Sequence, residues 1–244
     1  MAYFHFSEKK GKKGRASEHS AYIAREGKYG RGEKAEDLVA KGCLNLPDWA
    51  NGAPLVFWWA ADAYERVNGT AYREIEVALP NELTVEQNLE LVHELIQSEF
   101  PGRTVQFAIH APASSLRAVQ HTHAHIMGSD RVLDAIERPQ EQHFRRFNSA
   151  DPAGGGCRKD SGGRSRTAMK EEMHASRAAW AEMQNAALLK YGHEAQVDHR
   201  SNEARGLQRV PERYLGQVRI SKMSSQEKKL FIALQNDVQG RHGD

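Results

Sequence analysis

The sequence predicts an α+β domain built on a mostly antiparallel sheet. Segments that alternate apolar and polar side chains, as half-buried strands do, are interspersed with longer segments whose apolar residues recur at helical spacing. Two alternating segments, 103–111 and 121–132, are joined by a linker that is too short for a helical crossover. A short connection favours an antiparallel return, because parallel neighbours need a connection of about a dozen residues or more.

The first part of the chain is interpreted as one strand and two helices. Aromatic alternation predicts a strand over 2–6, and a basic, glycine-containing loop follows at 9–15. A helix is expected over 17–27, because a serine can cap its start and a glycine can end it. Residues 28–53 are interpreted as irregular, and the bulky apolar residues of 53–69 predict a second helix.

The next elements follow the same two patterns. Strict alternation predicts a strand over 70–80, which a proline ends. The segment 84–100 opens with a Thr-x-x-Gln capping box and carries an apolar stripe, so it is expected to be a helix. Strands over 103–111 and 121–132 come next, and a long helix over 167–192 closes at a glycine.

One folded domain and a tail are expected. The length of 244 residues allows one sizeable domain, which we place at 1–216. Residues 217–244 are polar and mixed in charge, so they are interpreted as a C-terminal extension. The glycine-rich stretch 153–163 is predicted to be a mobile loop inside the domain.

The composition excludes several classes of protein. The chain is 39% hydrophobic and 27% charged, and no apolar run is long enough to span a membrane. The N-terminus lacks the apolar core of a secretory signal. Two cysteines, far apart and without a C-x-x-C motif, argue against a disulfide framework or a cysteine zinc site. We therefore expect a cytoplasmic protein without membrane insertion.

Basic residues cluster although the net charge is only +2. The segment "KKGKKGR" has five basic residues in seven, and "RRF" at 145–147 and the stretch 157–166 are also basic. Such clusters suit the binding of nucleic-acid phosphates, while a solvated surface loop is the alternative. The candidate DNA-binding residues are Lys9, Lys10, Lys12, Lys13, Arg15 and Arg25.

Three predicted strands carry titratable side chains on one face and apolar side chains on the other. This separation follows from the alternation of side chains along a strand. If the three strands are neighbours, one side of the sheet gathers His110, His121, His123, His125, Glu74 and Glu76.

Such a face could hold a divalent cation. A His-x-His pair places two imidazoles about 7 Å apart at Cα, and a histidine from an adjacent strand would complete a set that leaves positions open for a substrate. Three neutral ligands leave the charge of the ion available to a phosphodiester. A glutamate could orient one imidazole through its second N–H. The alternative is an exposed strand with incidental histidines.

Tyr22, in the middle of the predicted helix 17–27, is the candidate attacking group. The sequence has no Ser-His-Asp spacing, Walker loop or G-x-G-x-x-G. A tyrosine nucleophile would form a covalent phosphotyrosine that retains the energy of the broken phosphodiester. Packing in the core or at an interface is the alternative for Tyr22. Tyr29 lies beyond the glycine that ends the helix, so a structural or DNA-contacting role is assigned to it.

Several motifs resemble one family when they are taken in order. The motifs are "AYIAREGKY" (21–29), "YREIEVALPNELT" (72–84), "QFAIHA" (106–111), "HAHIM" (123–127), "IERP" (136–139) with "FRRFN" (144–148), and "VDHRSNEARGLQRVPERYLG" (197–216). In this order they resemble the MobA/MobL family, plasmid mobilisation relaxases of the HUH endonuclease superfamily, and the resemblance covers about residues 2–216.

The resemblance implies an activity and a site. It implies about five antiparallel strands flanked by helices, and cleavage of one DNA strand at a plasmid transfer origin. Tyr22 would attack the phosphorus, stay linked to the 5′ phosphate and release a 3′ hydroxyl, and the reverse reaction would reclose the strand. The metal, Mg²⁺ or Mn²⁺, would bind three histidines, although ligand softness equally allows Zn²⁺. The implied ligands are His110, His123 and His125, and the acidic pair Glu74 and Glu76 would orient a ligand or assist proton transfer.

The resemblance also implies partners. These are single-stranded DNA at the transfer origin, with or without an adjacent hairpin or repeat, plasmid accessory mobilisation proteins and a type IV secretion coupling protein. His121 departs from the family pattern, because it is an extra histidine on the ligand face. It could replace a ligand or contact DNA. The linker 111–120 is also long for the family. The chain is either a small relaxase or a truncated one.

Three rival functions stay open. A rolling-circle replication initiator would share the chemistry but often carries two tyrosines one turn apart on one helix. A non-enzymatic DNA-binding protein could use His121 as the fourth ligand of a structural metal. A metal phosphodiesterase would use water and leave no adduct.

Overall fold

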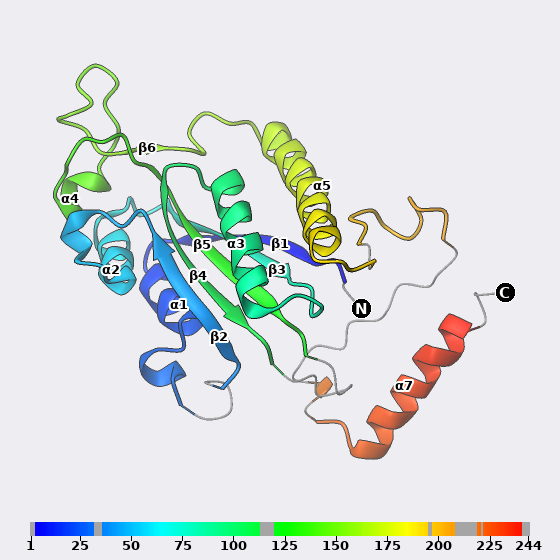
Figure 1. Cartoon of the computed structure of the whole chain (residues 1–244). Coiled ribbons are helices and arrows are strands. Elements are labelled where there is room, and N and C mark those ends of the chain that lie inside the picture. Colours follow the sequence, from blue (N-terminus) through cyan, green and yellow to red (C-terminus); the bar gives the residue numbers. More distant parts are fainter. Residues whose placement is uncertain are drawn as a thin grey trace.

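The computed structural model describes residues 3–31, 36–112, 120–194, 197–207, 219–220 and 222–240, with side chains as far as 233. In this part of the chain six strands form one antiparallel sheet in the order β1-β3-β5-β4-β2, with the short β6 paired to β5 (Figure 1). The predicted α+β class is confirmed. The strands are β1 (Phe6–Lys12), β2 (Leu38–Leu44), β3 (Thr70–Ala78), β4 (Arg103–His110), β5 (His123–Val132) and β6 (Arg158–Lys159).

Helices cover both faces of the sheet (Figure 1). One face is packed against α1 (Ala16–Ile23) and α2 (Pro54–Tyr64), and the other against α3 (Val85–Glu99) and α5 (Arg166–Lys190). The shorter elements are η1 (Gly27–Tyr29), η3 (Asp48–Ala50) and α4 (Gln140–His143), and α7 (Ser225–Gly240) follows near the end of the chain.

Two strand predictions near the N-terminus are wrong. The strand expected over 2–6 is instead Phe6–Lys12, so the first part of the basic segment is paired to β3 and is not a loop. The region 28–53, predicted to be irregular, contains β2. Because β2 is an edge strand with small residues such as Ala40 and Gly42, its sequence lacks the strong alternation that identifies a half-buried strand.

The start of α1 is fixed from another helix. Asp62 of α2 accepts hydrogen bonds from the backbone N–H groups of Gly14, Ala16 and Ser17, at 2.7, 3.0 and 2.8 Å. These are N–H groups that the first turn of a helix leaves without internal partners. Ser17, expected to cap the helix, instead donates its hydroxyl to Asp62. The helix ends at Ile23, before the expected Gly27, because Arg25 adopts a positive φ of 53°.

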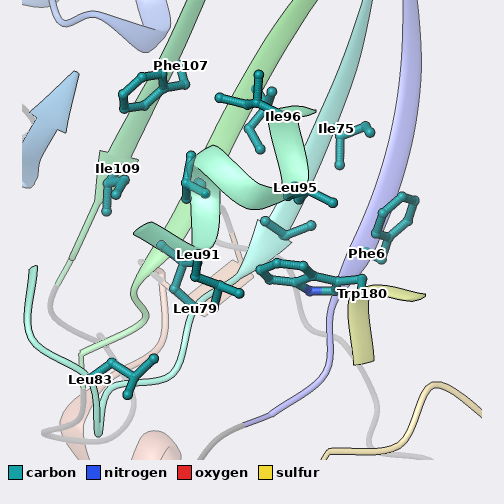
Figure 2. Packing of buried hydrophobic residues seen from close by; sticks show 14 of the residues in the cluster. Phe6, Ile75, Leu79, Leu83, Leu91, Leu95, Ile96, Phe107, Ile109 and Trp180 are labelled. Atoms are coloured by element: carbon teal, nitrogen blue, oxygen red, sulfur yellow. The ribbon is translucent and has the colours of Figure 1, made fainter. Parts of the chain in front are cut away.

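One of two apolar clusters lies between the sheet and the helices α3 and α5, and the other lies between the sheet and the helices α1 and α2. Figure 2 shows Ile75, Phe107 and Ile109 of the strands facing Leu95 of α3, with Trp180 of α5 beside them. The capping box predicted at Thr84 is present and starts α3. Full burial of a side chain such as leucine or isoleucine stabilises a fold by about 1.5–3 kcal/mol, so this face carries a large share of the stability.

The C-terminal half departs from the predictions at the glycine-rich stretch. The glycine-rich stretch 153–163 was expected to be a mobile loop, but residues 155–157 are buried and β6 lies within it. The polar extension contains α7. The proposed domain boundary at 216 lies outside the described residues. No described helix combines the length and the apolar character that crossing a bilayer requires.

Candidate metal and nucleophile site

Strand register brings three histidines together on the face covered by α1. His123 of β5 pairs directly with His110 of β4, and His125 pairs with Ala108 on one side and Glu76 on the other. The three imidazole rings lie 5.6 Å (His110 to His123), 5.4 Å (His110 to His125) and 5.2 Å (His123 to His125) apart between centroids. The facing of these side chains, predicted from alternation alone, is present in the structure.

Each of the three rings has its Nδ1 atom next to an oxygen acceptor. His125 Nδ1 lies 2.8 Å from Glu74 Oε1, and His123 Nδ1 lies 2.8 Å from the carbonyl oxygen of His121. His110 Nδ1 lies 3.0 Å from Asp37 Oδ1. Since these oxygens can only accept, they favour a proton on Nδ1 and leave the Nε2 lone pair for another partner. Metal-binding histidines are held in this way by their other ring nitrogen.

The donor set therefore fits a cation, although it is not assembled around one point. No group of three or more His, Cys, Asp or Glu side chains among the described residues has the arrangement of a ready-made metal site. The obstacle lies at His110, whose Nε2 is 2.9 Å from the carbonyl oxygen of Ile23. Both ring nitrogens of His110 therefore face an oxygen acceptor. A neutral imidazole has one N–H, so one of these two contacts has no proton between its atoms. A cation that took the Nε2 lone pair would remove this mismatch.

Burial favours the neutral forms of His110 and His123 by lowering their pKa values. It lowers the pKa of His123 to about 4, against a smaller opposing effect of the hydrogen bond to the His121 carbonyl. Burial also lowers the pKa of His110, while Asp37 acts in the opposite direction. Burial raises the pKa of Glu74, but contacts with His125 and His19 outweigh it and hold that pKa well below the ordinary range. Neutral imidazoles beside an ionised carboxylate are the protonation states that a metal requires.

Tyr22 lies on α1, directly above the histidines. Its ring centroid is 6.4 Å from that of His125, with the two rings edge to face. Three other groups hold the half-buried Tyr22 ring: His19 is stacked at 6.1 Å, Tyr29 meets it edge to face at 5.4 Å, and the Arg25 guanidinium lies 4.9 Å from its centre. Tyr22 thus contacts the histidine cluster and also packs against the apolar cluster under α1 and α2.

The two glutamates have different surroundings. Glu74 is buried, and besides His125 it faces His19, whose Nε2 lies 2.9 Å from Glu74 Oε1 without the alignment of a hydrogen bond. Glu76 is more exposed and pairs with Lys9 at 2.6 Å. Of the two glutamates, Glu74 therefore contacts the Nδ1 atom of a cluster histidine, and Glu76 pairs with Lys9 instead.

His121 is separate from the other three histidines. β5 begins at His123, not at residue 121 as predicted, so His121 does not share the strand face. Its ring is exposed and meets Tyr3 edge to face at 5.8 Å. The backbone carbonyl oxygen of His121 contacts His123 Nδ1, while the His121 side chain contacts Tyr3.

Sequence reasoning missed two residues of this site. His19 received no role, although it lies three residues before Tyr22 and so on the same helix face; this spacing was a usable signal. Asp37 was also missed. It binds His110 and is held by Arg25, whose Nε and Nη2 each lie 3.0 Å from one Asp37 oxygen. The 73 residues between Asp37 and His110 leave no local sequence signal.

The predicted DNA-binding residues divide into groups. Lys10, Lys12, Lys13 and Arg15 line a groove of about 750 Å³ that has Tyr22, His19 and Tyr72 in its walls. Lys9 is paired with Glu76 beside the cluster. Arg25 has a side chain only 7% exposed and is committed to Asp37, so the structure gives it a supporting place behind His110. A role of these residues in DNA binding stays a prediction.

Comparison with known families identifies the chain. The sequence profile of the MobA/MobL family matches residues 16–226. This chain belongs to the MobA/MobL family. The match includes α1, both strands of the histidine cluster and Glu74, so the site lies wholly within the family region except for β1.

Individual relatives agree with the family. The chain is 46% identical over 210 residues to a 43 kDa relaxation protein of Salmonella typhimurium, covering 86% of this chain and 56% of that protein. It is 36% identical over 221 residues to mobilization protein A of Escherichia coli, covering 88% of this chain and 30% of that protein. The chain thus spans about half the length, or less, of these curated relatives.

A solved structure shares the fold. It comes from work on the molecular basis of vancomycin resistance transfer in Staphylococcus aureus, and its TM-score is 0.58 at 24% sequence identity. The superposition covers 82% of this chain and 100% of the other. The helix-flanked antiparallel sheet of this MobA/MobL chain is therefore a known architecture.

Proposed function

We propose that this chain is a site- and strand-specific DNA nickase and strand transferase that acts at a plasmid transfer origin. The observation that carries the proposal is the position of Tyr22, 6.4 Å from His125 between ring centroids, above three histidines that each have Nδ1 next to an acceptor. Family membership supports this reading, since relatives of 46% and 36% identity are named a relaxation protein and a mobilization protein.

His110, His123 and His125 would hold a divalent metal, Mg²⁺ or Mn²⁺. When bound, the metal supplies Lewis-acid polarisation of the scissile phosphate. Glu74 keeps the His125 ring oriented, and Asp37 does the same for His110. This assignment gives Glu74 a positioning role and leaves Glu76, paired with Lys9, at the edge of the site.

Tyr22 performs the covalent step. Its Oη forms a bond to phosphorus while the bond between phosphorus and the 3′ oxygen breaks, so the tyrosine stays linked to the 5′ phosphate. The phenol loses one proton and the departing 3′ oxygen gains one, and the reverse reaction restores the strand. His19, Tyr29 and Arg25 hold the Tyr22 ring in place for this attack.

The groove leading to Tyr22 provides the path for single-stranded DNA. Its lysines and Arg15 suit the phosphates, and its aromatic side chains suit the bases. Accessory mobilisation proteins, a type IV coupling protein and a cytoplasmic location follow from the mobilisation role and are part of the proposal.

The test is a search for the covalent intermediate. The protein is incubated with Mg²⁺ or Mn²⁺ and single-stranded oligonucleotides that span candidate nick sites, and the products are separated on a denaturing gel. We expect a protein–DNA adduct that disappears with chelator and with Tyr22→Phe. Tyr29→Phe is the matched control, because Tyr29 is the neighbouring tyrosine, and it should retain the adduct.

Other outcomes would favour the rivals. Cleavage without an adduct would indicate a hydrolytic phosphodiesterase, and binding without cleavage would indicate a non-enzymatic protein with a structural metal. An adduct that survives Tyr22→Phe but not Tyr29→Phe would move the nucleophile to Tyr29.

A further inference from the structure

A second basic pocket lies at the opposite end of β5 from the histidines. It has a volume of about 250 Å³, and four arginines and a lysine line it together with Phe147 and Gly162. No carboxylate is among the described residues that line it. β6 and α4 gather at this end of the sheet (Figure 1). The basic lining residues are Arg66, Arg131, Arg146, Arg158 and Lys159.

Two of these cations are already neutralised. Arg131 is buried and binds Glu65 through Nε and Nη2, at 2.9–3.0 Å. Lys159 donates to the carbonyl oxygen of Thr70 at 2.7 Å and lies 3.2 Å from Glu65. Glu65, which is 2% exposed, therefore balances the charges of Arg131 and Lys159 inside the fold.

The other three cations have surplus charge. Arg146 and Arg158 are exposed and form no ion pair with a described residue. Arg66 reaches Glu65 only at 4.0 Å, with a side chain 62% exposed. Three guanidinium groups line one concavity with only the distant Glu65 carboxylate as counter-charge, so they repel one another, and an anion with several oxygens relieves that repulsion.

The end of α2 links the pocket to the groove that holds Tyr22. Lys13, in the wall of that groove, donates to the carbonyl oxygen of Ala63 at 2.8 Å. Arg66 follows Ala63 by three residues and lines the second pocket. Along β5, Arg131 lies six residues beyond His125, which corresponds to about 20 Å at the rise of a strand.

We propose that Arg66, Arg146 and Arg158 bind backbone phosphates of the DNA on one side of the nick, at the end of β5 that Arg131 marks about 20 Å along the strand from His125. This proposal rests on the proposed function, because it takes DNA as the ligand of the neighbouring groove. The separation corresponds to about six base-pair steps of a duplex. The pocket then determines how much DNA beside the nick the protein needs in order to bind tightly.

The test compares short and extended DNA. Binding is measured by fluorescence anisotropy in the Tyr22→Phe background, so that cleavage plays no part. The probes are a short oligonucleotide around the nick and versions extended by about ten nucleotides on either side. We expect extension on one side only to tighten binding. The triple variant Arg66→Gln/Arg146→Gln/Arg158→Gln should remove that gain, by about 10-fold or more, and lower the slope of log K against log salt by about 2–3.

Two controls make the result specific. The variant Lys170→Gln/Lys190→Gln/Lys229→Gln removes the same charge from exposed positions on α5 and α7, and it should keep the gain from extension. Thermal unfolding shows whether the pocket variant is folded, and the single variant Arg158→Gln gives a smaller loss in the same direction. Equal losses on short and extended DNA, or no loss on either, would overturn the proposal. Because the readout is binding, failure to find an adduct would leave this test unaffected.

Discussion

The two faces of the sheet differ although the same strands form both. Toward α3 and α5, the strands present fully buried apolar side chains such as Ile75 and Ile126. Toward α1, neighbouring residues on those strands present Glu74, Glu76 and His125. One strand thus contributes stability through one set of side chains and the candidate chemistry through the alternate set.

The contacts on the polar face show how the fold accommodates its buried polar groups. Each buried polar group of the cluster faces a specific partner: Glu74 faces His125, and Asp37 faces both His110 and Arg25. Burying such groups without partners would cost several kcal/mol. The apolar face, together with the apolar cluster under α1 and α2, supplies the stability that allows the sheet to keep a row of closely spaced titratable side chains.

The adjacent residues His125 and Ile126 give the largest expected effects and separate the two faces. His125→Asn keeps a donor for Glu74 but removes Nε2, so we expect nicking to fall by about 100-fold or more with a small change in stability. Ile126→Ala should cost about 2–5 kcal/mol of unfolding free energy and leave the nicking rate per folded molecule unchanged. Urea unfolding and single-turnover nicking measure the two quantities. Loss of nicking in both variants, or loss of stability in both, would contradict the separation of chemistry and stability between the two faces of the sheet.

Asp37→Asn tests the support behind His110. The variant keeps the shape of the side chain but removes the charge that holds the imidazole and Arg25. We expect the metal concentration needed for half-maximal nicking to rise by about 10–100-fold. Glu26→Gln, which removes an exposed partner of Lys41, is the control and should leave that concentration unchanged. An equal shift in both variants would mean that Asp37 has no particular link to the metal.

The pH dependence of stability has a defined sign. Burial lowers the pKa of His143 to about 4, aided by Arg131 and Arg138. The unfolded chain therefore binds more protons than the fold between pH 6.5 and 4, and the stabilisation is lost as the pH falls through that range. The loss amounts to about 3 kcal/mol at most for this group. Urea unfolding at pH 7 and 4.5 in chelator should show it, and His143→Phe should reduce it; an unchanged pH dependence in the variant would contradict this cause.

His121→Ala should have the smallest effect. The His121 side chain is exposed and contacts Tyr3, while the cluster uses only its backbone carbonyl, which alanine retains. We expect nicking and metal dependence to stay within about 3-fold of the original protein. A loss as large as that of His125→Asn would place the His121 side chain in the metal site and favour a four-histidine set.

The sequence could predict what alternation and capping determine. The parity of the strands correctly placed His110, His123 and His125 on one face with both glutamates, and the capping box correctly placed the start of α3. These features depend on residues close together in the chain. The antiparallel pairing of the strands that carry His110 and His123 was also expected from their short linker, but the register that places the two residues opposite each other was not.

Features that depend on distant contacts escaped prediction. Asp37 reaches His110, and Asp62 caps α1, across stretches of sequence that carry no local pattern. Arg25 looked like a DNA-binding residue because charge alone does not show that Asp37 covers it. The role of His121 stayed open, between a ligand and a DNA contact, because the start of β5 depends on the loop before it and not on alternation.

The most direct test of the account is to locate the covalent bond. The protein is reacted with a single-stranded transfer-origin oligonucleotide in Mg²⁺ or Mn²⁺, digested with protease and nuclease, and examined by tandem mass spectrometry. The account predicts one nucleotide-modified peptide, with the phosphate on Tyr22 and the free 3′ hydroxyl on the other DNA fragment. A phosphate on any other residue, or cleaved DNA with no modified peptide, would contradict the claim that the polar face of the sheet is a tyrosine transesterification site.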